Sequence, residues 1–257
     1  MGFEHLKVES GDRIGWIEYW RPPLNAFNWE MLLEVPKALA QLLNDSDTRV
    51  IIFASALEKY FSTGADLKVF QAMSPDDLRR WVETCHSLVL QMRAAQKPLL
   101  ACINGIAVGG GLEIVLHCDV RFAANDAKLG QPEINIAFIP PVGATQAYGR
   151  LLGRSRALRF LYEGSPVSAQ EALEMGLVDF VVPADRLRAE TAAYAVTLAK
   201  KPAGTLAVIR NCITVGMERP FEEALRLELD AAIALGSSRD FAEGLQAFLE
   251  KRTPKWE

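Results

Sequence analysis

Apolar residues in the first half of the chain follow two spacings. Alternating or continuous apolar runs of five or six residues are typical of strands, whereas runs of longer period are typical of helices. Strands are predicted at residues 14–19, 50–54, 99–103, 119–123 and 128–129. Helices are predicted at 27–43, with a kink at Pro36, and from Ser74 to about residue 95. The pattern therefore predicts alternating strands and helices whose turns converge on one edge.

Helix-start signals support this reading. Ser74 is followed by Pro75 and two acids, which is the composition of a capped first helical turn. Ser168 and Glu171 have the spacing of a capping box. Beyond Gly143 the pattern becomes mostly helical, with one further strand at 178–182. Helices are predicted at 144–152, 155–162, 168–175, 184–199, 204–215, 220–235 and 238–250.

Composition narrows the classes of protein that fit. The chain has 257 residues, half of them hydrophobic, which suits one large or two small domains with a sizeable core. A net charge of −4 does not indicate the positively charged surface with which proteins bind nucleic acid. No apolar run approaches the ~18 residues of a membrane span, and the N-terminus lacks an apolar signal core. The four cysteines form no CxxC pair, so we expect reduced thiols in a cytoplasmic protein.

The stretch from Lys97 to Asp119 carries the first candidate chemistry. Gly109, Gly110 and Gly111 follow a predicted strand and open a short apolar segment that contains Glu113. Glycines let the backbone approach a ligand closely, and the first N–H groups of a helix can hold an oxyanion. The alternative is a tight strand-to-helix turn followed by a solvated first-turn acid.

Two other stretches favour the chemical reading. Residues 60–68, YFSTGADLK, form a second turn of small residues, in which Ala65 can offer another amide to the same oxygen. Glu133 directly follows Pro132, so it is either a second acid of the same site or an ordinary first-turn acid. The three histidines are scattered without metal-ligand spacing, and no metal site is expected.

In this order, FSTGAD (61–66), NGIAVGGGLE (104–113) and GQPEIN (130–135) resemble the crotonase (enoyl-CoA hydratase/isomerase) superfamily. The resemblance extends from PLNAF (23–27) to EGLQAFLEKR (243–252). It implies an α/β spiral of ββα units with a helical C-terminal trimerisation region, usually in a homotrimer or a dimer of trimers. The implied division is a core over 1–195 and a helical region over 196–257 for oligomerisation and closure over CoA.

The resemblance also implies a reaction. Ala65 and Gly110 would form an oxyanion hole for a thioester carbonyl, while Glu113 and Glu133 would be the acid/base pair of an enoyl-CoA hydratase, a lyase of fatty acid metabolism. Coenzyme A would belong to the substrate, with no bound cofactor. An enoyl-CoA isomerase, a dienoyl-CoA hydratase and a non-catalytic CoA- or RNA-binding scaffold remain alternatives.

Contacts to CoA are expected around the FSTGAD turn. The resemblance places them at Lys59, Thr63, Ala65, Asp66, Leu67 and Lys68, and adds Phe248 and Lys251, sometimes from a neighbouring subunit. The alternative for each lysine is a solvated surface charge. For Asp66 the favoured alternative is a helix cap.

One departure concerns the acyl pocket. Typical hydratases continue with a stretch resembling IPGAGGTQ, whereas residues 139–146 read IPPVGATQ. The glycine whose amide helps to hold the attacking water in relatives aligns with Pro141, which has no N–H. Phe138 and Pro141 add apolar bulk, so we expect weak activity on crotonyl-CoA relative to a bulkier acyl group. The alternative is that another amide, such as that of Val142, replaces the missing donor.

Overall fold

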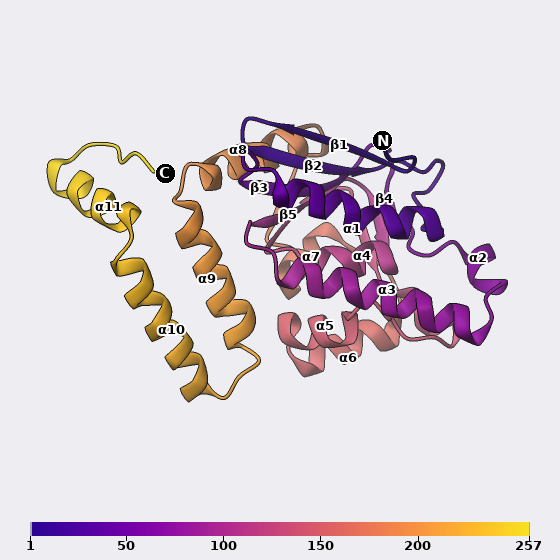
Figure 1. Ribbon diagram of the computed structural model, residues 1–257. Helices are drawn as coiled ribbons and strands as arrows, with labels where there is room; N and C mark the ends of the chain where they lie inside the picture. The colour runs from indigo at the N-terminus through magenta and orange to yellow at the C-terminus, as the bar shows by residue number, and fades with distance from the viewer. Residues whose placement is uncertain (1, 257) are drawn as a thin grey trace.

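The computed structural model describes residues 2–256 and contains two sheets (Figure 1). The larger sheet has six strands in the order β1-β2-β3-β5-β7-β10, and all neighbours are parallel except the antiparallel pair β1–β2. Its strands are β1 (Leu6–Gly11), β2 (Ile14–Tyr19), β3 (Val50–Ser55), β5 (Leu99–Ile103), β7 (Val120–Ala124) and β10 (Phe180–Val182).

The smaller sheet has four strands in the order β4-β6-β8-β9. Its first three strands are parallel, and β9 is antiparallel to β8. The strands are β4 (Tyr60–Ser62), β6 (Ile106–Val108), β8 (Lys128–Gly130) and β9 (Val167–Ser168). The three-residue strands β4 and β6, the two-residue β9 and the edge strand β1 were not predicted.

A repeated unit links the two sheets. β3 is followed by β4, β5 by β6 and β7 by β8, so each unit contributes one strand to each sheet. The first two units each end in α-helix and the third ends in a short 3₁₀ helix, η1 (Pro132–Ile136). The predicted α/β architecture of ββα units is therefore confirmed.

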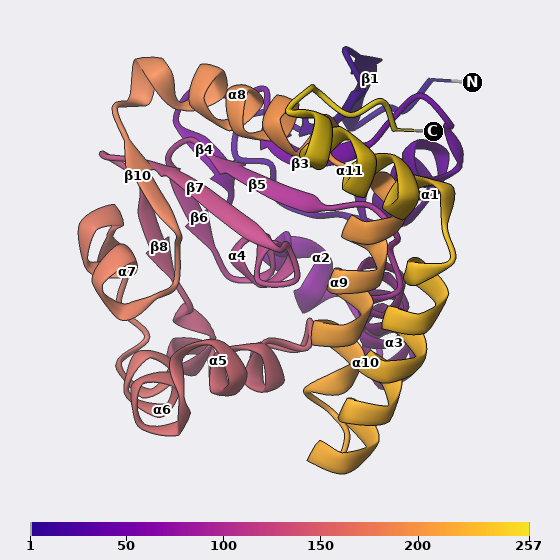
Figure 2. The same cartoon turned by 90° about the vertical axis from the view of Figure 1, so that its left-hand side faces the viewer.

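Helices cover the sheets. α3 packs on α1, and α8 packs on β2, β3, β5 and β7. The turned view shows α8 lying across the larger sheet (Figure 2). The cap at Ser74 and the capping box at Ser168 are both present. The helices are α1 (Trp29–Asn44), α2 (Leu67–Gln71), α3 (Pro75–Arg93), α4 (Gly110–Val115), α5 (Ala144–Leu152), α6 (Arg154–Glu163), α7 (Ala169–Met175), α8 (Leu187–Ala199), α9 (Ala203–Gly216), α10 (Phe221–Gly236) and α11 (Arg239–Glu250), with a further 3₁₀ turn η2 (Ala184–Arg186).

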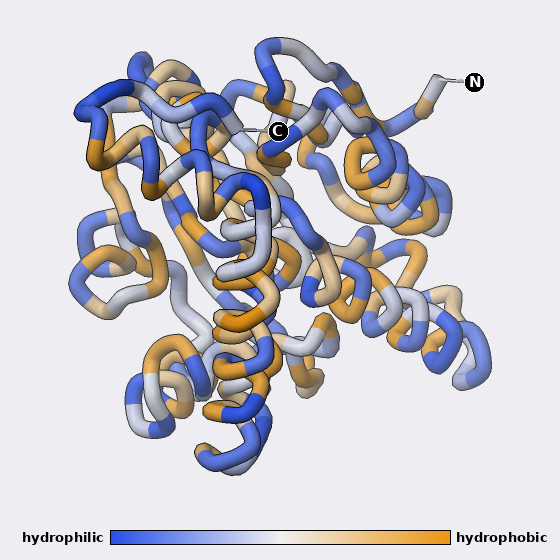
Figure 3. Tube along the Cα trace, turned by 60° about the vertical axis from the view of Figure 1, so that its left-hand side comes forward, coloured by the Kyte–Doolittle hydropathy of each residue, from blue (hydrophilic) through white to orange (hydrophobic). Residues whose placement is uncertain are grey.

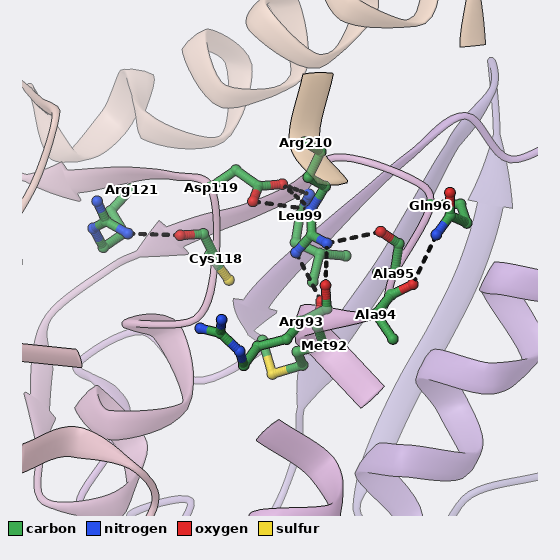
Figure 4. A network of polar contacts seen from close by, with 10 residues as sticks. All are labelled: Met92, Arg93, Ala94, Ala95, Gln96, Leu99, Cys118, Asp119, Arg121 and Arg210. Carbon is green, nitrogen blue, oxygen red and sulfur yellow. Dashed lines mark hydrogen bonds and ion pairs between the residues drawn. The ribbon is translucent and has the colours of Figure 1, made fainter. Parts of the chain in front are cut away.

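A buried arginine joins the C-terminal helices to the sheets. Arg210 of α9 donates from Nε to both carboxylate oxygens of Asp119, at 3.0 and 2.9 Å (Figure 4). Its two terminal nitrogens donate to the carbonyls of Met92, Arg93 and Ala95 at 2.7 to 2.8 Å. These carbonyls lie at the C-terminal end of α3, where helical partners are missing. One guanidinium therefore donates hydrogen bonds both to the carbonyls at the end of α3 and to the carboxylate just before β7.

The last three helices, α9 to α11, expose many large apolar side chains to solvent. α10 has no buried residue among its 16, and apolar positions recur along the helices that project from the body (Figures 1 and 3). The large exposed apolar side chains of α9–α11 and the α9–α10 turn are Ile209, Ile213, Met217, Phe221, Leu225, Leu229, Ile233, Phe241, Leu245, Phe248 and Leu249. So many exposed large apolar side chains on neighbouring helices are unusual for a monomer.

Candidate active site

The ends of three neighbouring strands supply the site. β4, β6 and β8 are parallel neighbours, so their carboxyl ends meet at one edge of the small sheet, where ligands commonly bind in α/β proteins. The chain after β4 carries Ala65, the chain after β6 carries Gly110, and the chain after β8 carries Glu133. Glu113 lies one turn further along, in α4. The fold thus gathers the four predicted residues.

Two amides lie side by side at this edge. Gly64 has a positive φ of 80°, and a Cβ on it would lie 2.8 Å from the Gly110 nitrogen, so only glycine permits this approach. A Cβ on Gly110 would lie 3.9 Å from the Ala65 nitrogen. Neither the Ala65 nor the Gly110 N–H donates a hydrogen bond to any group within residues 2–256. Both donors are available to one oxygen atom of a ligand.

Glu113 is completely buried. Its Oε2 accepts a hydrogen bond from the Val142 N–H at 2.7 Å, and its buried Oε1 has no partner among the described residues. Burial, and then the charge of Glu133, raise the pKa of Glu113 well above its usual value; the hydrogen bond from Val142 and the nearby Gln131 amide oppose this shift. Glu113 therefore holds a proton at a higher pH than an exposed glutamate.

Glu133 is held from behind by a buried pair of side chains. Its Oε2 accepts from Gln131 Nε2 at 2.9 Å, and Gln131 Oε1 accepts from the Tyr148 hydroxyl at 2.8 Å. A Cβ on Gly109 would lie 2.7 Å from Glu133 Oε1, so the carboxylate rests against bare backbone. Burial raises the pKa of Glu133 as well. Two acids of raised pKa that face one site are the groups expected to exchange protons with a bound substrate.

A largely apolar cavity of about 250 Å³ connects these groups. Both acids and both amides line it, and so do Phe138 and Pro141, the two residues predicted for an acyl pocket. Phe138 packs edge-to-face on Phe70 of α2, with ring centroids 5.9 Å apart. The remaining wall is mostly apolar and includes Phe27, Leu32, Leu67, Trp81 and Ile114. The cavity suits an apolar group that ends at the two acids.

A second, wider groove of about 860 Å³ adjoins the cavity and shares Thr63, Ala65 and Leu67 with it. Asp66 and Lys68 lie along this groove, together with Arg21. Asp66 accepts from the Lys68 N–H at 3.1 Å as the cap of α2, and from Arg21 Nη2 at 3.1 Å. The preference for a helix cap at Asp66 is thus confirmed.

The other predicted CoA contacts lie apart from the cavity and the groove. Lys59 is exposed in the turn before β4. Phe248 is 81% exposed on α11, and Lys251 follows that helix, on the far side of the chain from α2 (Figure 1). Their contacts to CoA stay predictions, which for Phe248 and Lys251 require a neighbouring subunit.

The loop that carries Pro141 has two contacts that sequence reasoning missed. His86 Nε2 lies 2.9 Å from the Pro141 carbonyl oxygen, and His117 Nε2 lies 2.9 Å from the Val142 carbonyl oxygen. Pro140 and Pro141 have no N–H, and the Val142 N–H is bonded to Glu113. Residues 140–142 therefore have no free N–H to hold a water molecule.

Other classes of site are not evident in the described chain. Within residues 2–256 no group of three or more His, Cys, Asp or Glu side chains is placed to hold a metal ion. None of the described helices combines the length and the apolar character that crossing a membrane requires.

Known proteins resemble the chain over its whole length. Residues 9–257 match the family model described as enoyl-CoA hydratase/isomerase. The chain is 32% identical over 253 residues to the crotonyl-CoA hydratase of Syntrophomonas wolfei, covering 98% of this chain and 97% of that protein. It is 37% identical to a probable enoyl-CoA hydratase of Bacillus subtilis, covering 91% and 92%. An enoyl-CoA hydratase crystal structure from Geobacillus kaustophilus superposes with a TM-score of 0.97 at 34% identity, covering 100% and 98%. The chain belongs to the enoyl-CoA hydratase/isomerase family.

Proposed function

We propose that the protein is an enoyl-CoA hydratase that adds water reversibly to a 2-enoyl-CoA thioester. The observation that carries this proposal is the pair of buried acids beside two unused amides at the end of an apolar cavity. The Ala65 and Gly110 N–H groups would hold the thioester oxygen, on which negative charge builds as the water oxygen bonds to Cβ. The names of the relatives support the same reaction.

The two acids account for the protons. One carboxylate takes a proton from the attacking water, and the other, protonated, gives its proton to Cα. Atoms and charge balance, because the water supplies OH to Cβ and the acid pair ends with the same number of protons. Burial raises the pKa of both Glu113 and Glu133, which favours a proton on one member of the pair. An isomerase needs only one such carboxylate, and two are present.

The neighbouring groove fits the coenzyme portion of the substrate. The thioester must lie where the groove meets the cavity, since Ala65 lines both. Lys68 would offer positive charge to a phosphate in this groove, whereas Arg21 is paired with Asp66; Thr63 and Leu67 would lie along the pantetheine path. Phe138 and Pro141 would then contact the acyl group.

Absorbance of the enoyl thioester tests the proposal directly. Crotonyl-CoA and a set of linear, branched and cyclic 2-enoyl-CoA thioesters are mixed with the protein, and the loss of the conjugated absorbance is followed. We expect turnover with at least one of them, and a loss of orders of magnitude in kcat for Glu113→Gln and for Glu133→Gln with CoA binding retained. Tight CoA binding without turnover of any thioester would favour a scaffold instead.

We further propose a homotrimer or a dimer of trimers, with residues 196–257 at the subunit contacts and residues 1–195 forming the core. The uncovered apolar side chains of α9–α11 support this, because water contact with them is unfavourable. Sedimentation equilibrium checks it, and a monomer at micromolar concentration would contradict it. The four free cysteines agree with a reducing compartment such as the cytoplasm, and the reaction with a place in fatty acid metabolism.

A further inference from the structure

Two of the three histidines in the chain hold consecutive carbonyl groups of one loop. His86 reaches the Pro141 carbonyl from α3, and His117 reaches the Val142 carbonyl from the turn after α4. A carbonyl oxygen only accepts, so each imidazole must carry its proton on Nε2. The loop between Pro140 and Gly143 is thus fixed from two sides.

The clamped peptide connects directly to Glu113. The Pro141 carbonyl and the Val142 N–H belong to the same planar peptide unit, and that N–H donates to Glu113 Oε2 at 2.7 Å. A continuous chain of hydrogen bonds therefore runs from His86 through this peptide to Glu113. Hydrogen bonds in such a chain polarise one another, and an oriented donor fixes its acceptor.

The imidazole ring of His117 packs against the backbone of Gly143. Gly143 has a φ of 69°, and a Cβ there would lie 3.2 Å from His117 Cε1, so the imidazole packs on bare backbone. Burial lowers the pKa of His117, with Arg93 and Arg121 also lowering it, against the bond to Val142. The ring is therefore neutral at neutral pH and donates from Nε2 without a change of charge.

We infer that His86 and His117 are positioning residues that hold the Val142 N–H on Glu113 Oε2 and so leave Oε1 as the oxygen that acts on the substrate. The inference rests on the proposed role of Glu113. Neither histidine lines the cavity or the groove, so both act through the loop and not through substrate contacts. With Pro140 and Pro141 unable to donate, no neighbouring N–H in that stretch can replace the one from Val142.

The inference predicts that loosening these hydrogen bonds lowers kcat and leaves KM nearly unchanged. Loosening the clamp misplaces the carboxylate, and a shift of about 1 Å in a catalytic group can cost about 10²-fold in rate. We expect His86→Met and His117→Met each to lower kcat about tenfold and the double variant about 10²-fold, with KM changed less than twofold. His86→Gln and His117→Gln keep an N–H donor near the same position and should recover most of kcat.

The pH profile gives a second signature. The Val142 bond lowers the pKa of Glu113, so loosening it should move the ionisation of Glu113 to higher pH. The other groups that act on Glu113 are Glu133, which raises its pKa, and Gln131, which lowers it; the Cys85 thiol and Tyr148 hydroxyl stay neutral at working pH because burial raises the pKa of each. The Gln variants should restore the original profile.

Hydrogen exchange of the Val142 amide, measured by NMR on the intact protein, tests the clamp without turnover. Exchange should be faster in both Met variants than in the unchanged protein and in both Gln variants. Ser87→Ala is the matched control, since Ser87 neighbours His86 on α3 and its hydroxyl donates, among the described residues, to the Glu83 carbonyl alone. Unchanged Val142 exchange in the Met variants, or Gln variants as slow in turnover as Met variants, would overturn the inference. A protein that hydrates no thioester but shows the expected exchange refutes the proposed function and leaves the clamp standing.

Discussion

Replacing Glu113 by glutamine should make the protein more stable and nearly inactive. Glu113 is completely buried, and burial together with Glu133 raises its pKa. When the folded-state pKa of an acid lies above its unfolded value, the folded protein binds the proton more tightly. The protonated carboxyl therefore stabilises the folded protein fully at a pH below its unfolded-state pKa. This stabilisation is lost as the pH rises through the folded-state pKa.

The magnitude follows from two opposing terms. Each unit by which the pKa is raised costs the unchanged protein about 1.4 kcal/mol of unfolding free energy at a pH above both values. Glutamine avoids this cost but replaces a charge-assisted bond from Val142 by a neutral one, a loss of about 1 kcal/mol. The pKa of Glu113 is raised well above its usual value by burial, so we expect the first term to be the larger one. The stabilising effect should be near zero at pH 5 and should grow towards pH 8.

Urea denaturation at pH 5, 6.5 and 8, at one protein concentration, measures this difference. Glu58→Gln is the control, because Glu58 is exposed in the turn before β4. In parallel, kcat should fall by about 10²–10⁴ for Glu113→Gln, the range for the loss of a general acid or base. A difference in unfolding free energy that is the same at all three pH values, or that shrinks as pH rises, would refute the reasoning.

Three further changes test other parts of the structure. Gly110→Pro deletes an oxyanion donor and should lower kcat about 10²–10³-fold. Gly110→Ala should keep most of kcat, because its Cβ would lie 3.8 Å or more from its nearest neighbours. Equal losses of kcat in the two variants would contradict the role of the Gly110 N–H. Pro141→Gly restores an N–H in this loop and should raise the hydration rate of crotonyl-CoA. Efficient hydration by the unchanged protein, not improved by Pro141→Gly, would favour the alternative that another amide replaces the missing donor. Arg210→Met removes the donor to the carbonyls at the end of α3 and to the partly exposed Asp119 carboxylate, and should lower the unfolding free energy by about 1–3 kcal/mol in urea. The exposed Arg226→Met should change it little, and a loss no larger than that of Arg226→Met argues against the role of Arg210.

Strand length and burial explain which elements the sequence predicts. β3 and β5 are buried along almost their whole length, so their apolar runs are unbroken. β1 exposes most of its residues at the edge of the sheet, and β4 and β6 have three residues each, too few to display a period. Such strands exist because neighbouring strands pair with them, which is tertiary information.

The residues of the site also differ in whether the sequence predicts them. Ala65, Gly110, Glu113 and Glu133 are predicted because each lies within a short motif that resembles the family, and the structure brings all four to one cavity. The partners that orient them lie far along the chain: His86 is 55 residues from Pro141, and Tyr148 is 17 from Gln131. The sequence suggests Val142 only as a substitute donor to water, whereas its N–H is bonded to Glu113. Long-range hydrogen bonds leave no periodic or local signal.

The place of Arg210 has a consequence for the order in which the protein is made. The carbonyl of Arg93, at the end of α3, receives its hydrogen bond from a side chain 117 residues further along the chain. Synthesis proceeds from the N-terminus at about 5–20 residues per second, so this end of α3 waits several seconds for its partner. We expect the core to become protease-resistant only after Arg210 has left the ribosome, which stalled chains ending before and after this residue would show. Equal resistance of both chains would mean that the core completes itself without the C-terminal helices.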